Sequence, residues 1–280
     1  MKHYMKGVML GLGVAMAGLC ANAHAVSQAP IVVQGAMDVE TSTLIKHLEH
    51  AKKSTVGGWT FWKGSLDGYP VIVSKTEIGM SHAAAATAIA ALTFHPRAII
   101  NQGTAGGHDS EVHVHDIVLG RETLNLGSFK TPARKRGEGA DVLAWEPMDI
   151  LTEEEDTSDK IIDKPMRRFT PAPVLFDIAM QHRSNYKKGN VIPGVIGSSD
   201  VWNNELDRIA NLHERFGTSA EEMEAASAAQ VAERFGVPFM AIRILSNNAT
   251  NGGAYDPVTA VECQEYVLSL LKAYIAQFKH

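Results

Sequence analysis

The alternation of short apolar runs with stretches of helical pattern constrains the fold of this chain most strongly. Six runs have the length and composition of strands, and they cover residues 31–35, 69–76, 98–103, 116–122, 191–200 and 237–246. Continuous apolar runs of this length are typical of strands that are covered on both faces. The alternation predicts a single α/β domain with a central mixed, largely parallel sheet flanked by helices.

The helical segments between these runs carry start signals of their own. Helices are predicted over residues 81–95, 219–236 and 256–278. Ser219 and Glu222 have the spacing of a capping box at the start of the second helix. Asp256 is the expected N-cap of the third helix, with Pro257 at its first position.

The first 25 residues have the pattern of a secretory signal peptide. Lys2 and Lys6 precede a short apolar run, and Ala23 and Ala25 form a small-residue cleavage site. The apolar run is short for a membrane span, although an uncleaved anchor is the alternative. We therefore expect cleavage after Ala25, an exported protein that is not held in the membrane, and a folded domain over residues 26–280.

Charge and cysteine content narrow the class of protein further. The net charge is −5, and removal of Lys2 and Lys6 from the 26 basic residues leaves 24 against 31 acidic residues. An acidic surface of this kind argues against a nucleic-acid binder. Cys20 leaves with the signal peptide, so Cys263 has no partner for an intramolecular disulfide.

The least regular region covers residues 127–170. It contains a basic segment, an acidic segment and several prolines. Blocks of like charge are usually solvated loops, and we expect a surface excursion here. A lid over a site or a dimer contact is the alternative interpretation.

Polar or Gly-rich motifs follow several of the predicted strands. They are GAMDVE (35–40), NQGTAGG (101–107), GSSDVWNN (197–204), EEMEAAS (221–227) and SNNA (246–249). Each has a simple structural explanation, such as a tight turn or an acid at a helix N-terminus. Ligands in open α/β sheets bind outside the carboxyl ends of the strands, so together the motifs indicate a ligand site.

In this order the motifs resemble the nucleoside phosphorylase/nucleosidase superfamily. Within it the chain is most similar to the 5′-methylthioadenosine/S-adenosylhomocysteine nucleosidases. The most specific stretch is EEMEAASAAQVAERFGVPFMAIRILS, and the resemblance extends over residues 31–278 but is loose through 127–190. It implies a cofactor-free purine nucleosidase that forms a homodimer.

The resemblance implies roles for residues around the sugar. Glu40 would orient and deprotonate the attacking water, and Thr104 would lie against the ribose. Met223 would pack under the sugar, and Glu224 would hold its 2′- and 3′-hydroxyls. These roles suit the chemistry, because cleavage of an N-glycosidic bond passes through a cationic sugar that a nearby carboxylate stabilises.

Further residues would contact the base. Trp202 would stack on the purine, the backbone of Asn203 would meet the base edge, and Ser246 would position the next side chain. That next residue is Asn247, where the family has an aspartate that protonates the leaving base. An amide donates hydrogen bonds but cannot transfer a proton.

Asn247 leaves three interpretations open. The protein is retuned to a 6-oxopurine nucleoside, it hydrolyses adenine nucleosides slowly with help from Asn248 or water, or it is a non-catalytic relative that binds or stores nucleosides. A turn residue is the purely structural interpretation of Asn247.

The choice between hydrolysis and phosphorolysis depends on cationic groups. Residues 35–44 contain no Arg or Lys, and they contain Glu40, so we expect water as the nucleophile. A phosphorylase is the alternative, with Lys75 or the basic cluster at 130–136 as the phosphate ligand. The histidines at 108, 113 and 115 lack a completing set of ligands, and no metal is expected.

Overall fold

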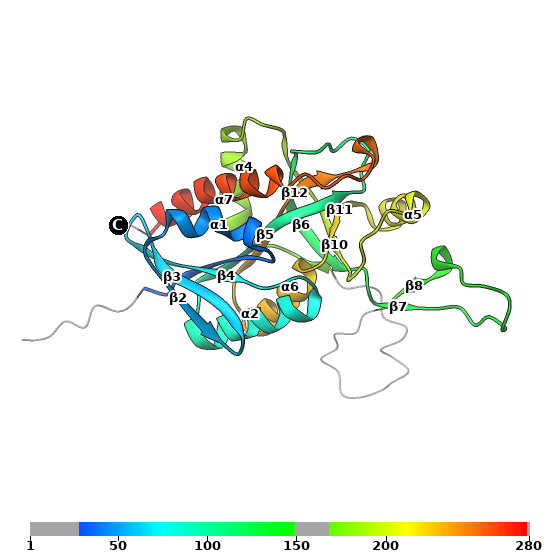
Figure 1. Ribbon diagram of the computed structural model, residues 1–280, viewed down its shortest axis with the longest axis horizontal. Helices are drawn as coiled ribbons and strands as arrows, with labels where there is room; N and C mark the ends of the chain where they lie inside the picture. Colours follow the sequence, from blue (N-terminus) through cyan, green and yellow to red (C-terminus); the bar gives the residue numbers. More distant parts are fainter. Residues whose placement is uncertain (1–27, 149–167, 279–280) are drawn as a thin grey trace, which may run out of the picture.

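Ten strands share one mixed sheet in the described part of the chain, and helices cover both of its faces (Figure 1). The computed structural model describes residues 28–148 and 168–278. The predicted signal peptide lies outside the described residues, as does much of the predicted irregular region. The predicted α/β fold with a mixed, largely parallel sheet is confirmed.

The strands of the sheet follow the chain in this order: β1 (Ile31–Gly35), β2 (Glu49–Val56), β3 (Trp59–Leu66), β4 (Tyr69–Lys75), β5 (Ala98–Gly107), β6 (Ile117–Asn125), β9 (Arg168–Phe169), β10 (Val191–Ser198), β11 (Thr218–Glu222) and β12 (Phe239–Asn247). β5 pairs in parallel with β1 and β12, and β10 pairs in parallel with β6 and β11. β11 also pairs with β5 in the antiparallel direction. Because β12 pairs with β6 as well, the strands β5, β12, β6, β10 and β11 form a closed ring.

Most of the described helices lie in two layers. The described α-helices are α1 (Asp38–His47), α2 (Met80–Phe94), α4 (Pro173–His182), α5 (Leu206–Phe216), α6 (Ala225–Arg234) and α7 (Val258–Ala276). α1 and α4 pack against α7 on one face of the sheet, and α2 packs against α6 on the other (Figure 1). Within the described residues, no helix combines the length and the apolar character that crossing a membrane requires.

The apolar strands supply side chains to both faces. All residues of β1 are buried; Ile31 and Val33 belong to the same core cluster as Val267 of α7. Val32 belongs to the other cluster, with Ala228 of α6. Successive side chains of a strand point to opposite faces, which explains why the run is apolar throughout.

The predicted helix over residues 219–236 is wrong in its first part. Residues 218–222 form β11, whose side chains are all buried between β10 and β5. Glu222 is not in a capping box with Ser219; its carboxylate accepts hydrogen bonds from the backbone N–H groups of Glu224 and Ala225. Closure of the ring of strands therefore overrides the local helix signal, and α6 begins after Glu224.

Other boundaries also differ from the predictions. β5 runs through the Gly-rich segment expected to be a turn, because Gly107 lets two strands approach: a Cβ there would lie 2.9 Å from Leu245 Cδ1. α7 begins one residue after Pro257, and Asp256 Oδ1 does accept a hydrogen bond from the N–H of Val258, at 2.9 Å. The β2–β3 hairpin was not predicted, because β2 is polar and largely exposed.

Part of the predicted irregular region is described. Residues 127–148 contain a short ribbon of β7 (Phe129–Lys130) and β8 (Glu146–Pro147), which projects from the sheet (Figure 1). Arg215 of α5 donates to the carbonyl of Trp145 at 2.8 Å and tethers the ribbon. A surface excursion is therefore present, and the structure does not test whether it serves as a lid or a dimer contact.

A buried arginine connects the strands beneath the carboxyl edge of the sheet. Arg243 of β12 is 1% exposed and donates to the backbone and side-chain oxygens of Asn101 in β5, at 3.1 and 2.7 Å. Its guanidinium also pairs with the Glu222 carboxylate of β11. The arginine therefore compensates a buried acid while holding three strands together.

We predict that Arg243→Met lowers the free energy of unfolding by about 3–5 kcal/mol, because Glu222 loses its buried counter-charge. Urea denaturation measures the change. Arg121→Met, at an exposed position of β6, is the control, and it should change stability by less than about 0.5 kcal/mol. Equal stabilities for the two variants would contradict a structural role for the Arg243 pair.

Candidate active site

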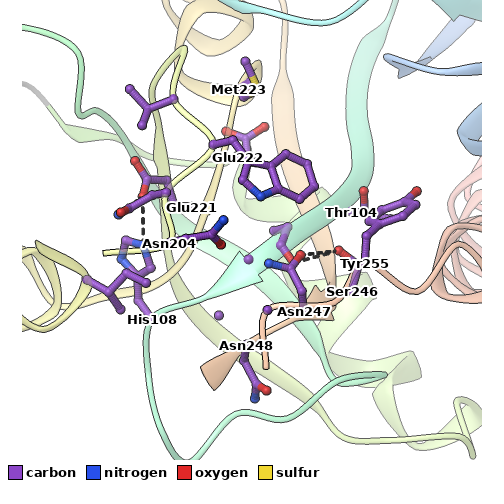
Figure 2. A pocket seen from close by; sticks show the side chains of 18 of the residues that line it. Thr104, His108, Asn204, Glu221, Glu222, Met223, Ser246, Asn247, Asn248 and Tyr255 are labelled. Atoms are coloured by element: carbon purple, nitrogen blue, oxygen red, sulfur yellow. Dashed lines mark hydrogen bonds and ion pairs between the residues drawn. The ribbon is translucent and has the colours of Figure 1, made fainter. Parts of the chain in front are cut away.

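A cavity of about 690 Å³ opens at the carboxyl ends of β1, β5 and β12 (Figure 2). Five segments line most of it: the β1–α1 junction, the end of β5, the β10–α5 loop, the β11–α6 junction and the loop after β12. All of the site residues predicted from the sequence line this cavity: Glu40, Thr104, Trp202, Asn203, Met223, Glu224, Ser246 and Asn247. The structure thus brings the predicted residues together, whereas their individual roles stay predictions.

Glu40 lines the cavity and is 3% exposed. One carboxylate oxygen accepts from the N–H groups of Ala36 and Met37, at 2.9 and 3.2 Å. The other oxygen accepts from the N–H and the hydroxyl of Thr104, at 2.8 and 3.0 Å. Glu40 lies in the first turn of α1, so its position follows from the β1–α1 junction and the end of β5.

Glu224 lies at the N-terminus of α6, with one oxygen 2.9 Å from the N–H of Gly79. Burial, together with the nearby negative charge of Glu222, raises the pKa of the Glu224 carboxyl to about 8, although Arg243 opposes the shift. At neutral pH Glu224 is therefore a neutral acid, which can both donate and accept hydrogen bonds. Such a group suits a pair of ligand hydroxyls.

Asn247 ends β12 with its side chain in the cavity (Figure 2). The Ser246 hydroxyl lies 2.8 Å from Asn247 Oδ1 and 3.2 Å from the carbonyl of Ala105, and the shorter contact fixes the amide. The Asn247 Nδ2 then lies beside Gly106, because a Cβ placed on that glycine would be 3.3 Å from the nitrogen. The site therefore presents an N–H donor at the end of β12.

Trp202 and Asn203 belong to the β10–α5 loop. Trp202 is 62% exposed, and its ring meets that of Tyr255 edge to face at 6.4 Å. The Asn203 side chain donates to Glu221 at 2.8 Å, which holds the loop against β11. The loop therefore presents an aromatic face at the mouth of the cavity and is fixed by a polar contact beneath it.

Sequence reasoning missed Glu221, His108 and Tyr255, which also line the cavity. Glu221 accepts from His108 Nε2 at 2.9 Å and from Ser199 and Asn203 (Figure 2). Burial by itself would raise the pKa of the Glu221 carboxyl, but these hydrogen bonds outweigh burial and hold the pKa at about 2. Glu221 is therefore a charged anchor for the β10–α5 loop.

The signals for these residues were present but ambiguous. His108 directly follows the Gly-rich motif, and Glu221 begins the acidic motif at residues 221–227, where an acid is also expected at a helix start. The histidines considered as metal ligands separate: His108 pairs with Glu221, and His115 lies 2.9 Å from Glu262. Among the described residues, no group of three or more potential ligands could hold a metal ion.

Comparison with known proteins gives the family. The model of the phosphorylase superfamily matches residues 30–276. The chain belongs to the phosphorylase superfamily. A 5′-methylthioadenosine/S-adenosylhomocysteine nucleosidase of Shewanella sp. (strain MR-7) is 32% identical over 227 residues, which cover 81% of this chain and 87% of that protein. The nucleosidase of Bacillus thuringiensis (strain Al Hakam) is also 32% identical, over 78% of this chain and 86% of that protein.

Solved structures of superfamily members share the fold. The 5′-methylthioadenosine/S-adenosylhomocysteine nucleosidase of Colwellia psychrerythraea 34H, in complex with adenine, has a TM-score of 0.69 and 27% identity, and covers 88% of this chain and 95% of that chain. The futalosine hydrolase of Helicobacter pylori strain 26695 has a TM-score of 0.68 and 22% identity, covering 87% and 97%. The second likeness concerns the fold alone.

The raised pKa of Glu224 predicts a pH dependence of stability. The folded protein keeps this proton between the ordinary carboxyl range and about pH 8, where the unfolded chain has lost it, so stability falls as pH rises through that window. We predict that Glu224→Gln removes roughly 2 kcal/mol of the stability loss between pH 6 and pH 9. Thermal unfolding across this range measures it.

Glu214→Gln is the control, because Glu214 is exposed on α5. This variant should lose stability with pH as the wild type does. Parallel stability curves for Glu224→Gln and the wild type would contradict a proton held on Glu224.

Proposed function

We propose that this protein is a purine nucleosidase that hydrolyses the N-glycosidic bond of a nucleoside to the free base and the sugar. The buried Glu40 carboxylate that lines the cavity carries the proposal. The nucleosidases that are 32% identical to this chain support it. A reaction of this type requires groups that bind the base, groups that bind the sugar and a group that activates water, and residues of all three kinds line the cavity.

The hydrolysis follows from the position of Glu40. Its carboxylate accepts from fixed donors on both oxygens, so it is held in one orientation. In that orientation it can take a proton from water and stabilise the positive charge that develops on the sugar. Glu224 would hold the sugar hydroxyls, and Met223 would pack against the sugar.

Water suits this cavity better than phosphate. A phosphorylase needs cationic donors, but no Lys or Arg lines the cavity within the described residues. Lys75, which was considered as a phosphate ligand, lies 3.1 Å from Asp38 and 3.5 Å from Glu77. Its charge is already compensated by two carboxylates.

The orientation of Asn247 supports selection of a 6-oxopurine. Its Nδ2 carries two hydrogens, and N7 and O6 of hypoxanthine or guanine are both acceptors on one edge of the base. Adenine presents an amino group at C6, which would meet an N–H donor. Because Oδ1 is turned toward the Ser246 hydroxyl, the amide presents its Nδ2 donor to the base and not its acceptor.

We also propose that the protein is exported and acts as a homodimer. Export rests on the signal-peptide pattern of residues 1–25. The dimer is supported by exposed apolar residues that line the cavity at its mouth, among them Ile78 at 50% and Leu206 at 62% exposure. A second subunit there would cover an apolar surface that a soluble monomer leaves in water.

The function is tested by release of free base from inosine, guanosine, adenosine and methylthioadenosine, with and without phosphate. We expect release without phosphate, and we expect Glu40→Gln to lower kcat by at least about 10²-fold. Asp38→Asn, two residues earlier and 82% exposed at its side chain, is the control and should retain activity. Binding without release of any base would support the non-catalytic alternative, and a requirement for phosphate would support a phosphorylase.

Asn247→Asp tests base selection separately. A carboxyl group at this position can carry a proton to N7, so activity on adenosine relative to inosine should rise by about tenfold or more. Asn251→Asp makes the same change four residues later, outside the cavity, where the side chain donates to the carbonyl of Ala254. The control should leave the ratio unchanged, and an unchanged ratio in Asn247→Asp would contradict the assigned role.

A further inference from the structure

One polar group in the cavity has no partner. The Tyr255 hydroxyl is buried from solvent and makes no hydrogen bond with any described residue. The residue lies in the loop after β12 and lines the same cavity as Glu40 and Asn247. A buried hydroxyl without a partner is unfavourable, and in a binding site it indicates a ligand group that completes it.

Tyr255 lies at the sugar end of the cavity. Figure 2 shows it beside Thr104, on the other side of Asn247 from His108 and Glu221. The Thr104 hydroxyl donates its proton to Glu40 at 3.0 Å, so toward Tyr255 it could only accept, and the geometry of the two hydroxyls forms no hydrogen bond. Burial raises the pKa of the Tyr255 phenol, although the nearby Thr104 hydroxyl opposes the shift, and the phenol is a hydrogen-bond donor at neutral pH.

Of the three hydroxyls of a ribonucleoside, one has no partner among the residues assigned so far, and Tyr255 can contact it. In the proposed function, Asn247 donates hydrogen bonds to the base, Glu40 faces the anomeric carbon, and Glu224 binds the 2′- and 3′-hydroxyls. The remaining hydroxyl of the ribose is the 5′-hydroxyl. A thioether at this position would be a poor substitute, because its sulfur is only a weak acceptor.

We propose that the Tyr255 hydroxyl donates a hydrogen bond to the 5′-hydroxyl of the substrate, so that the site selects nucleosides with a free 5′-hydroxyl over 5′-thio-substituted nucleosides. The inference rests on the proposed function and specifies its substrate class. Trp202, whose ring meets the Tyr255 ring edge to face, would hold the phenol in this orientation. Tyr255 is then a residue that determines specificity, while Glu40 performs the chemistry.

The test is a cycle of two enzymes and two substrates. Wild type and Tyr255→Phe are compared on the preferred nucleoside and on its 5′-deoxy form, with kcat/KM as the readout. The ratio of kcat/KM for the parent nucleoside to kcat/KM for its 5′-deoxy form should be about three- to tenfold larger in the wild type than in Tyr255→Phe. This factor corresponds to the loss of one neutral hydrogen bond. The 2′-deoxy form is the internal control, and its ratio to the parent nucleoside should be the same in both enzymes.

Tyr266→Phe is the matched control variant. It removes another buried tyrosine hydroxyl, which donates to the carbonyl of Ala179 at 2.9 Å outside the cavity. It should leave the preference for the 5′-hydroxyl as in the wild type. Equal preferences in the wild type and Tyr255→Phe, or a change confined to the 2′-deoxy ratio, would overturn the proposal.

Binding separates this proposal from the proposed function. Calorimetric titration with the carbocyclic analogue of the preferred nucleoside repeats the comparison without chemistry, because its ring lacks the oxygen that stabilises the cation while N7 of its base still accepts a hydrogen bond. If the protein releases no base but binds the 5′-hydroxyl form more tightly, and Tyr255→Phe loses that preference, then only the catalytic proposal fails. If hydrolysis occurs but neither readout depends on Tyr255, then only the selection of the 5′-hydroxyl fails.

Discussion

Four hydrogen bonds converge on the Glu40 carboxylate, and the arrangement of the cavity depends on them. They join the β1–α1 junction to the end of β5, two segments that lie far apart in the sequence. The space for the carboxylate exists because residue 103 is glycine: a Cβ there would lie 2.7 Å from Glu40 Oε1. A charged group that is held this firmly has little freedom to reorient, which favours the transition state over other arrangements.

A second set of charges lies behind the sugar side of the cavity. Glu222 and Glu224 both lie close to Arg243. The guanidinium contacts the carboxylate of Glu222 and lies 3.7 Å from that of Glu224. One cation does not compensate both acids in a buried environment, so Glu224 keeps its proton to about pH 8. The groups that stabilise the sheet therefore also set the hydrogen-bonding character of the sugar site.

The sequence predicted the alternating fold and placed the motif residues at one edge, because apolar runs and strand-end motifs are local patterns. It did not predict β11, because residues 218–222 resemble a helix start and become a strand only when the ring of strands closes. Tyr255 was missed for a related reason: nothing in its loop sequence marks it, and its place in the cavity depends on packing against Trp202. The protonation of Glu224 likewise depends on Arg243, from a distant strand.

The sugar product tests the central claim, that Glu40 directs water to the anomeric carbon, most directly. Incubation of the protein with a nucleoside labelled with ¹³C at the anomeric carbon, in the presence of saturating phosphate, can be followed by ¹³C and ³¹P NMR. We expect free sugar as the labelled product, at a rate that does not depend on phosphate. Formation of a sugar 1-phosphate would contradict that claim.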